Sequence, residues 1–333
     1  MGKQLVGMLS SYVGLQGRKD WLWQQSPNHF GVWGTMQMLP QAPDPDFLVL
    51  YQFNFKQKSA AASQKKSLLS RALQKLPGFK PSQASTPQSP VDFSSQFRGV
   101  PKERIIYLMR EPPLPEVKQN HQRIYQQATR YCGYVSGPDD SAPDPDYMPA
   151  IWYLNNSFRE LNEMPPPEKI ETASWITSGI NRTESHRKRL QFLQLLCDRG
   201  LGVDIYGRDL PPWVKGFGEI KNKWFATAPY YYNLAVENYA ENDWYVSEKL
   251  WDALLSWCLP IYYGGSAADK LLPPKSFLRL PSLDEKGIQY IQEVIASPDA
   301  WYEAKDAIAE ARQIILHELN LLGWLYKFVE RSV

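Results

Sequence analysis

The residues of this chain that are best suited to chemistry lie between positions 230 and 264. There Ser247 precedes Glu248 and Lys249, and apolar residues then recur at helical spacing up to Trp257. Serine is a preferred N-cap residue, so a helix is predicted over residues 248–257. The first turn of a helix carries free backbone N–H groups and the positive end of the helix dipole, and Lys249 adds a full positive charge. This turn therefore predicts a binding site for a phosphate group.

Three further elements would position that helix start. Strands are predicted over residues 232–236 and 260–263, and an acidic and aromatic loop over residues 237–246 joins the first strand to the helix. A strand followed by a loop and a helix directs the helix N-terminus toward the space beyond the strand. Ligands of open α/β sheets bind there, at the carboxyl ends of the strands.

A second candidate group follows another predicted strand. A strand is predicted over residues 104–109, whose residues 105–109 are apolar, and Glu111 follows after Arg110, ahead of two prolines. Catalytic groups tend to lie at the C-terminal ends of strands in open α/β sheets. We therefore take Glu111 as a candidate catalytic group, with the capping of the following turn as the alternative.

Residues 230–264 also carry a resemblance to a known family. They are similar to the donor-binding motif of the α-1,3/4-fucosyltransferases, glycosyltransferase family 10, which reads roughly Y-K-F-x-L-A-F-E-N-S, a short loop, then D-Y-[IV]-T-E-K-L-W. The residues that match in order are Tyr230, Leu234, Ala235, Glu237, Asn238, Tyr245, Glu248, Lys249, Leu250 and Trp251. The departures from the motif are Val236, Tyr239, Trp244 and Ser247.

The resemblance implies roles for the matching residues. It assigns Glu248 to the donor sugar or to the positive charge that develops on it, and Asn238 to donor contacts. Lys249 and the Tyr245 hydroxyl would meet the diphosphate. Glu111 resembles the glutamate of the family's E-S-P segment, which supplies the general base.

A third segment resembles the family's W-x-x-S-N segment, whose following helix holds the pyrophosphate through an early arginine. A strand is predicted over residues 172–178, and Asn181 with Glu184 predicts a capping box at the start of the next helix. When one inserted residue is allowed in matching this helix to the family's segment, Arg187 takes the place of that arginine. Arg189 is the second choice. A solvated helix face is the alternative for both.

The fold implied by the resemblance is α/β and of the GT-B type, with two facing Rossmann-like domains and a cleft between them. We expect an acceptor-binding domain over residues 1–165 and a nucleotide-sugar (donor) domain over residues 166–315. We expect a C-terminal helix over residues 316–333 that packs back on the first domain.

The implied reaction is an inverting transfer of L-fucose from GDP-β-L-fucose to a hydroxyl of a glycan acceptor, in an α-1,3/4-type linkage. It would use a carboxylate base and neither a metal nor a cofactor, since GDP-fucose is a co-substrate. One alternative is the same chemistry with another nucleotide sugar, because Tyr239 and Trp244 depart from the motif in the donor loop. The others are a catalytically silent glycan-binding relative, and a glycosidase with Glu237 and Glu248 as its carboxylate pair. The cations Lys249 and Arg187 argue against hydrolysis.

Composition narrows the class of protein. The 37 basic and 35 acidic residues nearly balance, which argues against a nucleic-acid-binding protein. The three cysteines lack a Cys-x-x-Cys pair, which favours a reducing compartment. No run of 18 apolar residues would span a membrane. Since Golgi members of the family carry a membrane anchor, we expect a cytoplasmic protein of the bacterial type.

The charged side chains of residues 56–80 are all basic. They predict either a solvated helix face or a patch for anionic lipid or an acidic acceptor glycan, which would place the protein at the inner face of the membrane. The Asp-Pro-Asp triplets at 44–46 and 144–146 imitate a metal-binding motif but are predicted to be turns.

Overall fold

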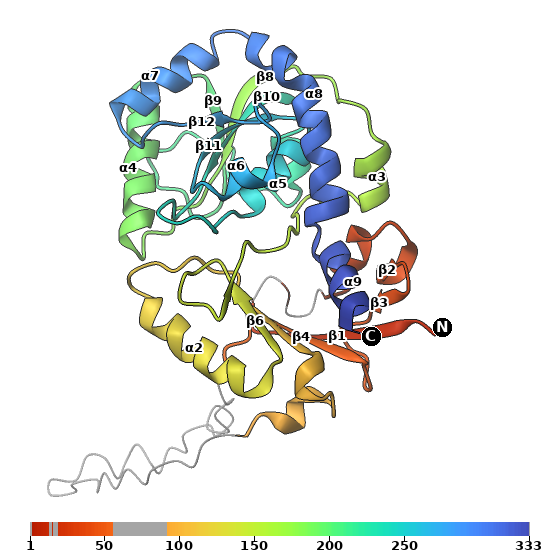
Figure 1. The fold of residues 1–333 in the computed structure, drawn as a ribbon. Coiled ribbons are helices and arrows are strands. Elements are labelled where there is room, and N and C mark those ends of the chain that lie inside the picture. Colours follow the sequence, from red (N-terminus) through yellow and green to blue (C-terminus); the bar gives the residue numbers. More distant parts are fainter. Residues whose placement is uncertain (1, 13–14, 16–18, 56–91, 333) are drawn as a thin grey trace, which may run out of the picture.

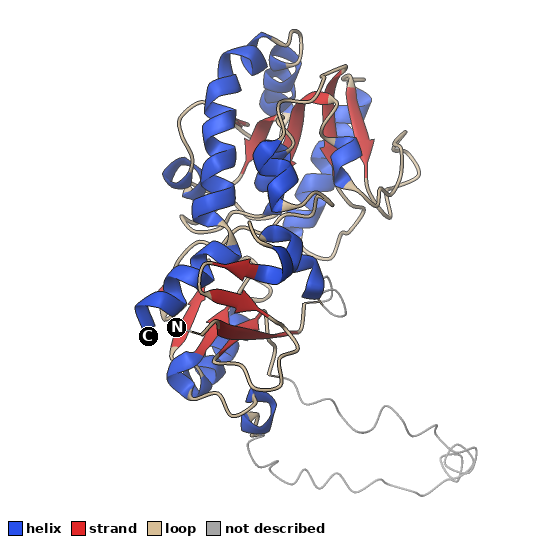
Figure 2. Ribbon diagram, turned by 90° about the vertical axis from the view of Figure 1, so that its right-hand side faces the viewer, coloured by secondary structure: helices blue, strands red, loops and turns tan. Residues whose placement is uncertain are grey.

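The computed structural model describes residues 2–12, 15, 19–55 and 92–332. The basic segment 56–80 lies outside the described residues, so its contact with a membrane or a glycan stays a prediction. The described chain forms two α/β domains, one above the other in Figure 1, and each has a central layer of strands with helices on both sides (Figure 2). The two facing domains confirm the GT-B architecture expected from the sequence.

The first domain is built on a seven-stranded sheet of order β2-β3-β1-β4-β5-β6-β7. All neighbouring strands are parallel except β2 and β3. The strands are β1 (Gln4–Ser10), β2 (Val32–Trp33), β3 (Met36–Met38), β4 (Phe47–Tyr51), β5 (Ile105–Leu108), β6 (Tyr134–Gly137) and β7 (Asp144–Pro145). Every residue of β4 and β5 is buried, as their continuous apolar runs predict for parallel strands that are covered on both faces.

The two faces of this sheet are covered by different helices. On one face, helix α2 (Lys118–Tyr131) packs through Ile124 and Ala128 against alternate residues of β4 and β5. On the other face, α9 (Leu321–Ser332) packs through Leu325 and Val329 against the residues between them. Short 3₁₀ helices connect the strands: η1 (Lys19–Gln25), η2 (His29–Gly31), η4 (Ser94–Phe97) and η5 (Lys102–Arg104).

The second domain contains a five-stranded parallel sheet of order β12-β11-β10-β8-β9. Its strands are β8 (Glu171–Ile176), β9 (Val203–Tyr206), β10 (Tyr230–Val236), β11 (Leu259–Tyr263) and β12 (Leu278–Arg279). Its helices are α3 (Phe158–Glu163), α4 (Glu184–Asp198), η6 (Lys223–Ala226), α5 (Glu248–Leu255), α6 (Ala267–Leu271), α7 (Glu285–Val294) and α8 (Asp299–Ile314). One large core joins them, with Trp175, Trp251 and Trp301 among its buried side chains.

The C-terminal segment joins the two domains. Helix α8 packs in the second domain, a π-helical turn (Ile315–Leu319) follows, and α9 packs on the first domain (Figure 1). Between them, the buried Asn320 side chain donates a hydrogen bond to the Gln25 carbonyl at 2.8 Å. The described helices include none that is both long and apolar enough to cross a membrane.

The start of α4 differs from the prediction. The capping box is formed by Thr183 and His186, not by Asn181 and Glu184: the Thr183 hydroxyl accepts from the His186 N–H, and His186 Nδ1 accepts from the Thr183 N–H, each at 3.2 Å. The imidazole supplies the acceptor that a Glu or Gln usually provides at this position. Helix α4 therefore begins at Glu184.

The triplet at 144–146 also differs from the prediction, because Asp144 and Pro145 form the short edge strand β7 rather than a turn. Proline has no N–H to donate, and an edge strand tolerates it because its outer side has no neighbouring strand to accept a hydrogen bond. Within the described residues, no group of three or more His, Cys, Asp or Glu side chains is arranged to hold a metal ion.

Candidate active site

Helix α5 begins where the sequence predicts, directly after Ser247. Ser247 has an extended backbone, and its hydroxyl accepts a hydrogen bond from the Lys249 N–H at 3.4 Å. The preceding strand β10 and the loop at 237–246 bring this helix start to the carboxyl edge of the second sheet.

A buried carboxylate fixes the geometry of this first turn. Glu237 accepts hydrogen bonds from the Ser247 N–H at 2.8 Å, from the Ser247 hydroxyl at 2.7 Å and from Lys249 Nζ at 3.0 Å. Burial alone would lower the pKa of Lys249, but the negative charges of Glu237 and Glu248 outweigh it and raise that pKa. Lys249 is therefore a fixed positive charge, and Glu237 serves as its anchor.

A second cation lies at the same edge. Arg189 is only 5% exposed, and its guanidinium donates to Asn238 Oδ1 at 2.7 Å and to the Ser178 carbonyl at 2.9 Å. It forms no ion pair with a carboxylate of the described residues, its Nε has no hydrogen-bond partner, and burial lowers its pKa to about 10. A buried cation without a counter-charge is costly, so this position calls for an anionic ligand.

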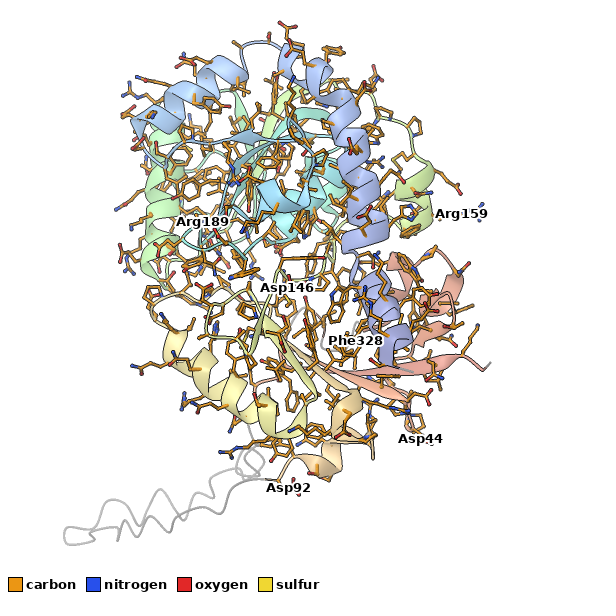
Figure 3. The ribbon with its side chains drawn as sticks, viewed as in Figure 1. Asp44, Asp92, Asp146, Arg159, Arg189 and Phe328 are labelled. Carbon is orange, nitrogen blue, oxygen red and sulfur yellow. The ribbon has the colours of Figure 1, made fainter. Side chains whose placement is uncertain are left out.

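The two arginines named from the sequence differ in their surroundings. Arg187 is exposed and is absent from the pocket lining, whereas Arg189 lines the pocket. Figure 3 shows Arg189 on the inner side of α4, above the boundary with the first domain. Arg189 extends the buried stripe of Phe192, Leu193 and Leu196 at i, i+3, i+4 and i+7, and this spacing was a signal that could have ranked it first.

These cations face one pocket of about 310 Å³ at the carboxyl ends of β8, β9 and β10. It is lined by Ile176, Thr177, Ser178, Arg189, Gly207, Arg208, Glu219, Ile220, Lys223, Val236, Asn238, Glu248 and Lys249. Gly207 has a φ of 148°, and a Cβ there would lie 1.6 Å from the Thr177 carbonyl oxygen, so only glycine fits this wall. The position and size of the pocket suit a ligand as large as a nucleotide.

Glu248 is one of the two carboxylates that line the pocket, and the other is the exposed Glu219. Glu248 forms an ion pair with Arg110 of the first domain. Burial alone would raise the pKa of Glu248, but the neighbouring charges of Lys249, Arg110 and Lys223 outweigh it and hold that pKa well below its usual range. Glu248 is therefore ionised, in a pocket that also contains cations.

Glu111 and Tyr245 lie beside the pocket without lining it. Glu111 is exposed at the end of β5, and its N–H donates to Gln52 Oε1 at 3.2 Å. Tyr245 is buried, and burial, together with the charges of Glu237 and Glu111, raises the pKa of its hydroxyl well above the usual value. The segment that carries Glu111 reaches the second domain, because the preceding residue, Arg110, pairs with Glu248.

Several residues of this region were not predicted from the sequence, and Lys223 and Arg110 are two charged examples. Lys223 lines the pocket from η6 and pairs with the buried Asp252 at 2.6 Å. Arg110 joins Glu248 across 138 positions of sequence. Neither belongs to a local motif, so nothing in their sequence neighbourhood indicates the contact.

Residues 166–303 match the family model "Glycosyltransferase family 10 (fucosyltransferase) C-term". A 136-residue stretch is 32% identical to alpha-(1,3)-fucosyltransferase C of Drosophila melanogaster, covering 40% of this chain and 30% of the relative. The chain thus spans less than a third of the length of the curated relative it matches.

The chain is also similar to solved structures of glycosyltransferases, and two of them are described here. An alpha1,3-fucosyltransferase crystallised with GDP-fucose has a TM-score of 0.41 and 17% identity, over 99% of this chain and 90% of that one. T4 phage BGT, in complex with its UDP-glucose substrate, has a TM-score of 0.45 and 12% identity, over 100% of this chain and 99% of that one.

The residues matched by the family model, 166–303, include the pocket, its cations and Glu248. This part of the chain is therefore similar to the C-terminal domain of glycosyltransferase family 10, the fucosyltransferase family.

Proposed function

We propose that this protein transfers L-fucose from GDP-β-L-fucose to a hydroxyl group of a glycan acceptor, in an α-1,3/4-type linkage and with inversion at the anomeric carbon. The observation that carries the proposal is the buried guanidinium of Arg189, which has no counter-charge among the described residues and lines a pocket of about 310 Å³ together with Lys249. A nucleoside diphosphate supplies the charge that this arrangement lacks.

Departure of GDP is the step that these cations assist. As the bond between C1 of the sugar and the β-phosphate oxygen breaks, negative charge grows on that oxygen. Arg189 and Lys249 are already held at the wall of the pocket by their hydrogen bonds, and preorganised cations of this kind stabilise a transition state strongly. We propose that with this charge supply the reaction needs no metal.

Glu248 is assigned to the sugar itself. The anomeric carbon and ring oxygen acquire positive charge as the leaving group departs. An ionised carboxylate at the edge of the diphosphate pocket stabilises that charge, and the low pKa of Glu248 keeps it ionised at neutral pH. Asn238, which accepts from Arg189, would orient that guanidinium toward the donor.

Glu111 is assigned to the acceptor. The acceptor oxygen attacks C1 on the face opposite GDP, and its proton passes to the Glu111 carboxylate. This single displacement turns the β-linked donor into an α-linked product. The position of Glu111 supports the assignment, because Glu111 is exposed after β5 and the preceding residue, Arg110, contacts Glu248.

Another nucleotide sugar is the second candidate donor. The motif departures that suggested it are Tyr239 and Trp244, and neither lines the pocket. Trp244 instead donates through its indole N–H to Asp140 of the first domain at 2.6 Å, and Tyr239 packs against Tyr245 with ring centres 6.3 Å apart. These departures have roles outside the pocket, which favours fucose as the donor.

The test is a transfer assay in EDTA. GDP-fucose, GDP-mannose and UDP-galactose are each offered with a panel of galactose- and N-acetylglucosamine-containing oligosaccharides, and NMR of the product gives the anomeric configuration and the linkage. We expect transfer from GDP-fucose alone, in the α configuration. Transfer from another donor would contradict the fucose assignment, loss of transfer in EDTA would contradict the metal-free mechanism, and binding without transfer would indicate a silent relative.

A further inference from the structure

An ion pair crosses from the first domain to the donor pocket beside the proposed base. Arg110, the residue before Glu111, donates from Nη2 to Glu248 Oε2, and the two side chains are only 12% and 18% exposed. The space left beside them is about 10 Å³ and is lined from both domains, by Tyr51 and Ile151 on one side and Val246 and Trp251 on the other. So small a space holds one water at most. Because the pair is shielded from solvent, the loss of one partner leaves a costly unpaired charge.

The side chain of Arg110 is oriented from the first-domain side. Its guanidinium carbon lies 4.5 Å from the centre of the Tyr12 ring and 5.3 Å from that of Tyr153, and Nη1 donates to the Tyr153 hydroxyl at 2.9 Å. With one nitrogen on Tyr153 and the other on Glu248, the planar guanidinium spans two fixed partners. A lysine ammonium could keep the charge but not this two-pronged geometry.

The backbone of the same residue fixes the start of the Glu111 segment. Gln52 Oε1 accepts hydrogen bonds from the N–H groups of both Arg110, at 2.7 Å, and Glu111, at 3.2 Å. Gln52 is itself anchored, since its N–H donates to the Leu108 carbonyl at 2.8 Å. The main chain that carries Glu111 is therefore held at its backbone by Gln52 and, through the Arg110 side chain, by Glu248.

Tyr153 extends this link along α5. Its N–H donates to Asp252 Oδ1 at 2.8 Å, and Asp252 Oδ2 accepts from Lys223 of the pocket wall at 2.6 Å. Glu248 and Asp252 stand one turn apart on the same face of α5. That face thus presents two carboxylates, and both are bound to a network that includes Tyr153.

We propose that Arg110 is a positioning residue that fixes Glu111 on the first domain relative to Glu248 on α5, and thereby sets the separation between the general base and the donor sugar. The role rests on the proposed function, because it assigns no new reaction to the site. It predicts that Arg110 acts on turnover rather than on nucleotide affinity, since Arg110 does not line the pocket.

The test compares Arg110→Met and Arg110→Lys with Arg159→Met, a matched control on α3 whose side chain is 70% exposed. For Arg110→Met we expect kcat for fucose transfer to fall by about 100-fold, since a misplacement of about 1 Å can cost that much. The Kd for GDP should stay within about threefold of wild type, Arg110→Lys should recover part of kcat, and the control should match wild type. An unchanged kcat, or a Kd that rises as much as kcat falls, would overturn the positioning role.

A double-mutant cycle, measured by thermal unfolding, tests the contact between Arg110 and Glu248 without any substrate. Arg110→Met, Glu248→Gln and the double variant are compared, and we expect the double variant to lose less in Tm than the sum of the single losses, because both substitutions remove one interaction. Additive losses would overturn the link between the two residues. A wild-type protein that transfers no sugar contradicts the proposed function, whereas an active wild type whose Arg110→Met variant retains its kcat contradicts the positioning role alone.

Discussion

Lys249 Nζ lies 3.0 Å from Glu237 Oε2, and the same carboxylate accepts the N–H and the hydroxyl of Ser247 at the start of α5. Glu237 thus binds both the N-cap residue of the helix and the cation that follows it. The strand that ends just before Glu237 and the helix that begins after Ser247 are held together by this one buried carboxylate. The turn that we propose to bind phosphate is for that reason held in place before any ligand arrives.

Removal of the Glu237 charge should loosen this turn. In Glu237→Gln, Lys249 loses its ion-pair partner in a buried setting, and we expect the free energy of unfolding to fall by about 3 kcal/mol. Chemical denaturation monitored by tryptophan fluorescence would measure it. Glu285→Gln, which removes one partner of an exposed ion pair with Arg199, is the control and should change stability by less than about 1 kcal/mol. Equal effects of the two substitutions would contradict the anchoring role.

Lys249→Ala should weaken donor binding. A charge-assisted hydrogen bond to a phosphate is worth about 1.5–3 kcal/mol, so the Kd for GDP should rise by about one to two orders of magnitude in calorimetry. Lys188→Ala, an exposed lysine of α4 paired with Glu184, is the control. An unchanged GDP affinity in Lys249→Ala would remove this residue from the site.

The two arginines of α4 should differ. Arg189→Met removes the buried cation of the pocket, and we expect the Kd for GDP to rise at least tenfold, or about 1.4 kcal/mol. Arg187→Met alters an exposed side chain outside the pocket lining and should leave that Kd unchanged. A larger rise of the Kd in Arg187→Met than in Arg189→Met would instead support Arg187, the first choice from the sequence.

Glu111→Gln should separate binding from catalysis. Loss of the general base should lower kcat by about two to four orders of magnitude, while the Kd for GDP stays constant because Glu111 does not line the pocket. Single-turnover kinetics with GDP-fucose would measure the chemical step directly. Survival of turnover would mean that another group accepts the acceptor proton.

Acidification should weaken the fold partly through Glu248. Its pKa in the folded chain lies well below that of an unfolded glutamate, about 4.3. Its ionised form therefore contributes stability that is present above that unfolded value and is lost as the pH falls toward the folded pKa. Melting curves between pH 7 and pH 3 should show a smaller acid-induced loss for Glu248→Gln than for wild type. An equal acid-induced fall in Tm in both proteins would show that the ionised form of Glu248 does not stabilise the fold.

The core elements were predictable because their signals are local. The apolar runs at 47–51 and 105–108 are buried strands, and Ser247 caps α5 as its position before Glu248 and Lys249 predicts. Each of these features is specified within about ten residues of chain. The donor motif falls in this class, since its strand, loop and helix are contiguous.

The parts that sequence reasoning missed depend on side-chain direction or on distant contacts. Arg187 and Arg189 stand two positions apart on one helix, so they point to nearly opposite sides, and the choice between them turned on one inserted residue. The apolar periodicity would have placed Arg189 on the buried face. By contrast, the contact of Arg110 with Glu248 requires both domains to be in place, and no pattern near either residue specifies it.

Calorimetric titration of the pure protein with GDP-fucose in EDTA would show directly whether the pocket between Arg189 and Lys249 binds a GDP-sugar. We expect saturable one-to-one binding of GDP-fucose, a slightly lower affinity for GDP, and a much lower affinity for UDP-galactose. Absence of binding by both GDP-fucose and GDP would contradict the assignment of this pocket to a GDP-sugar.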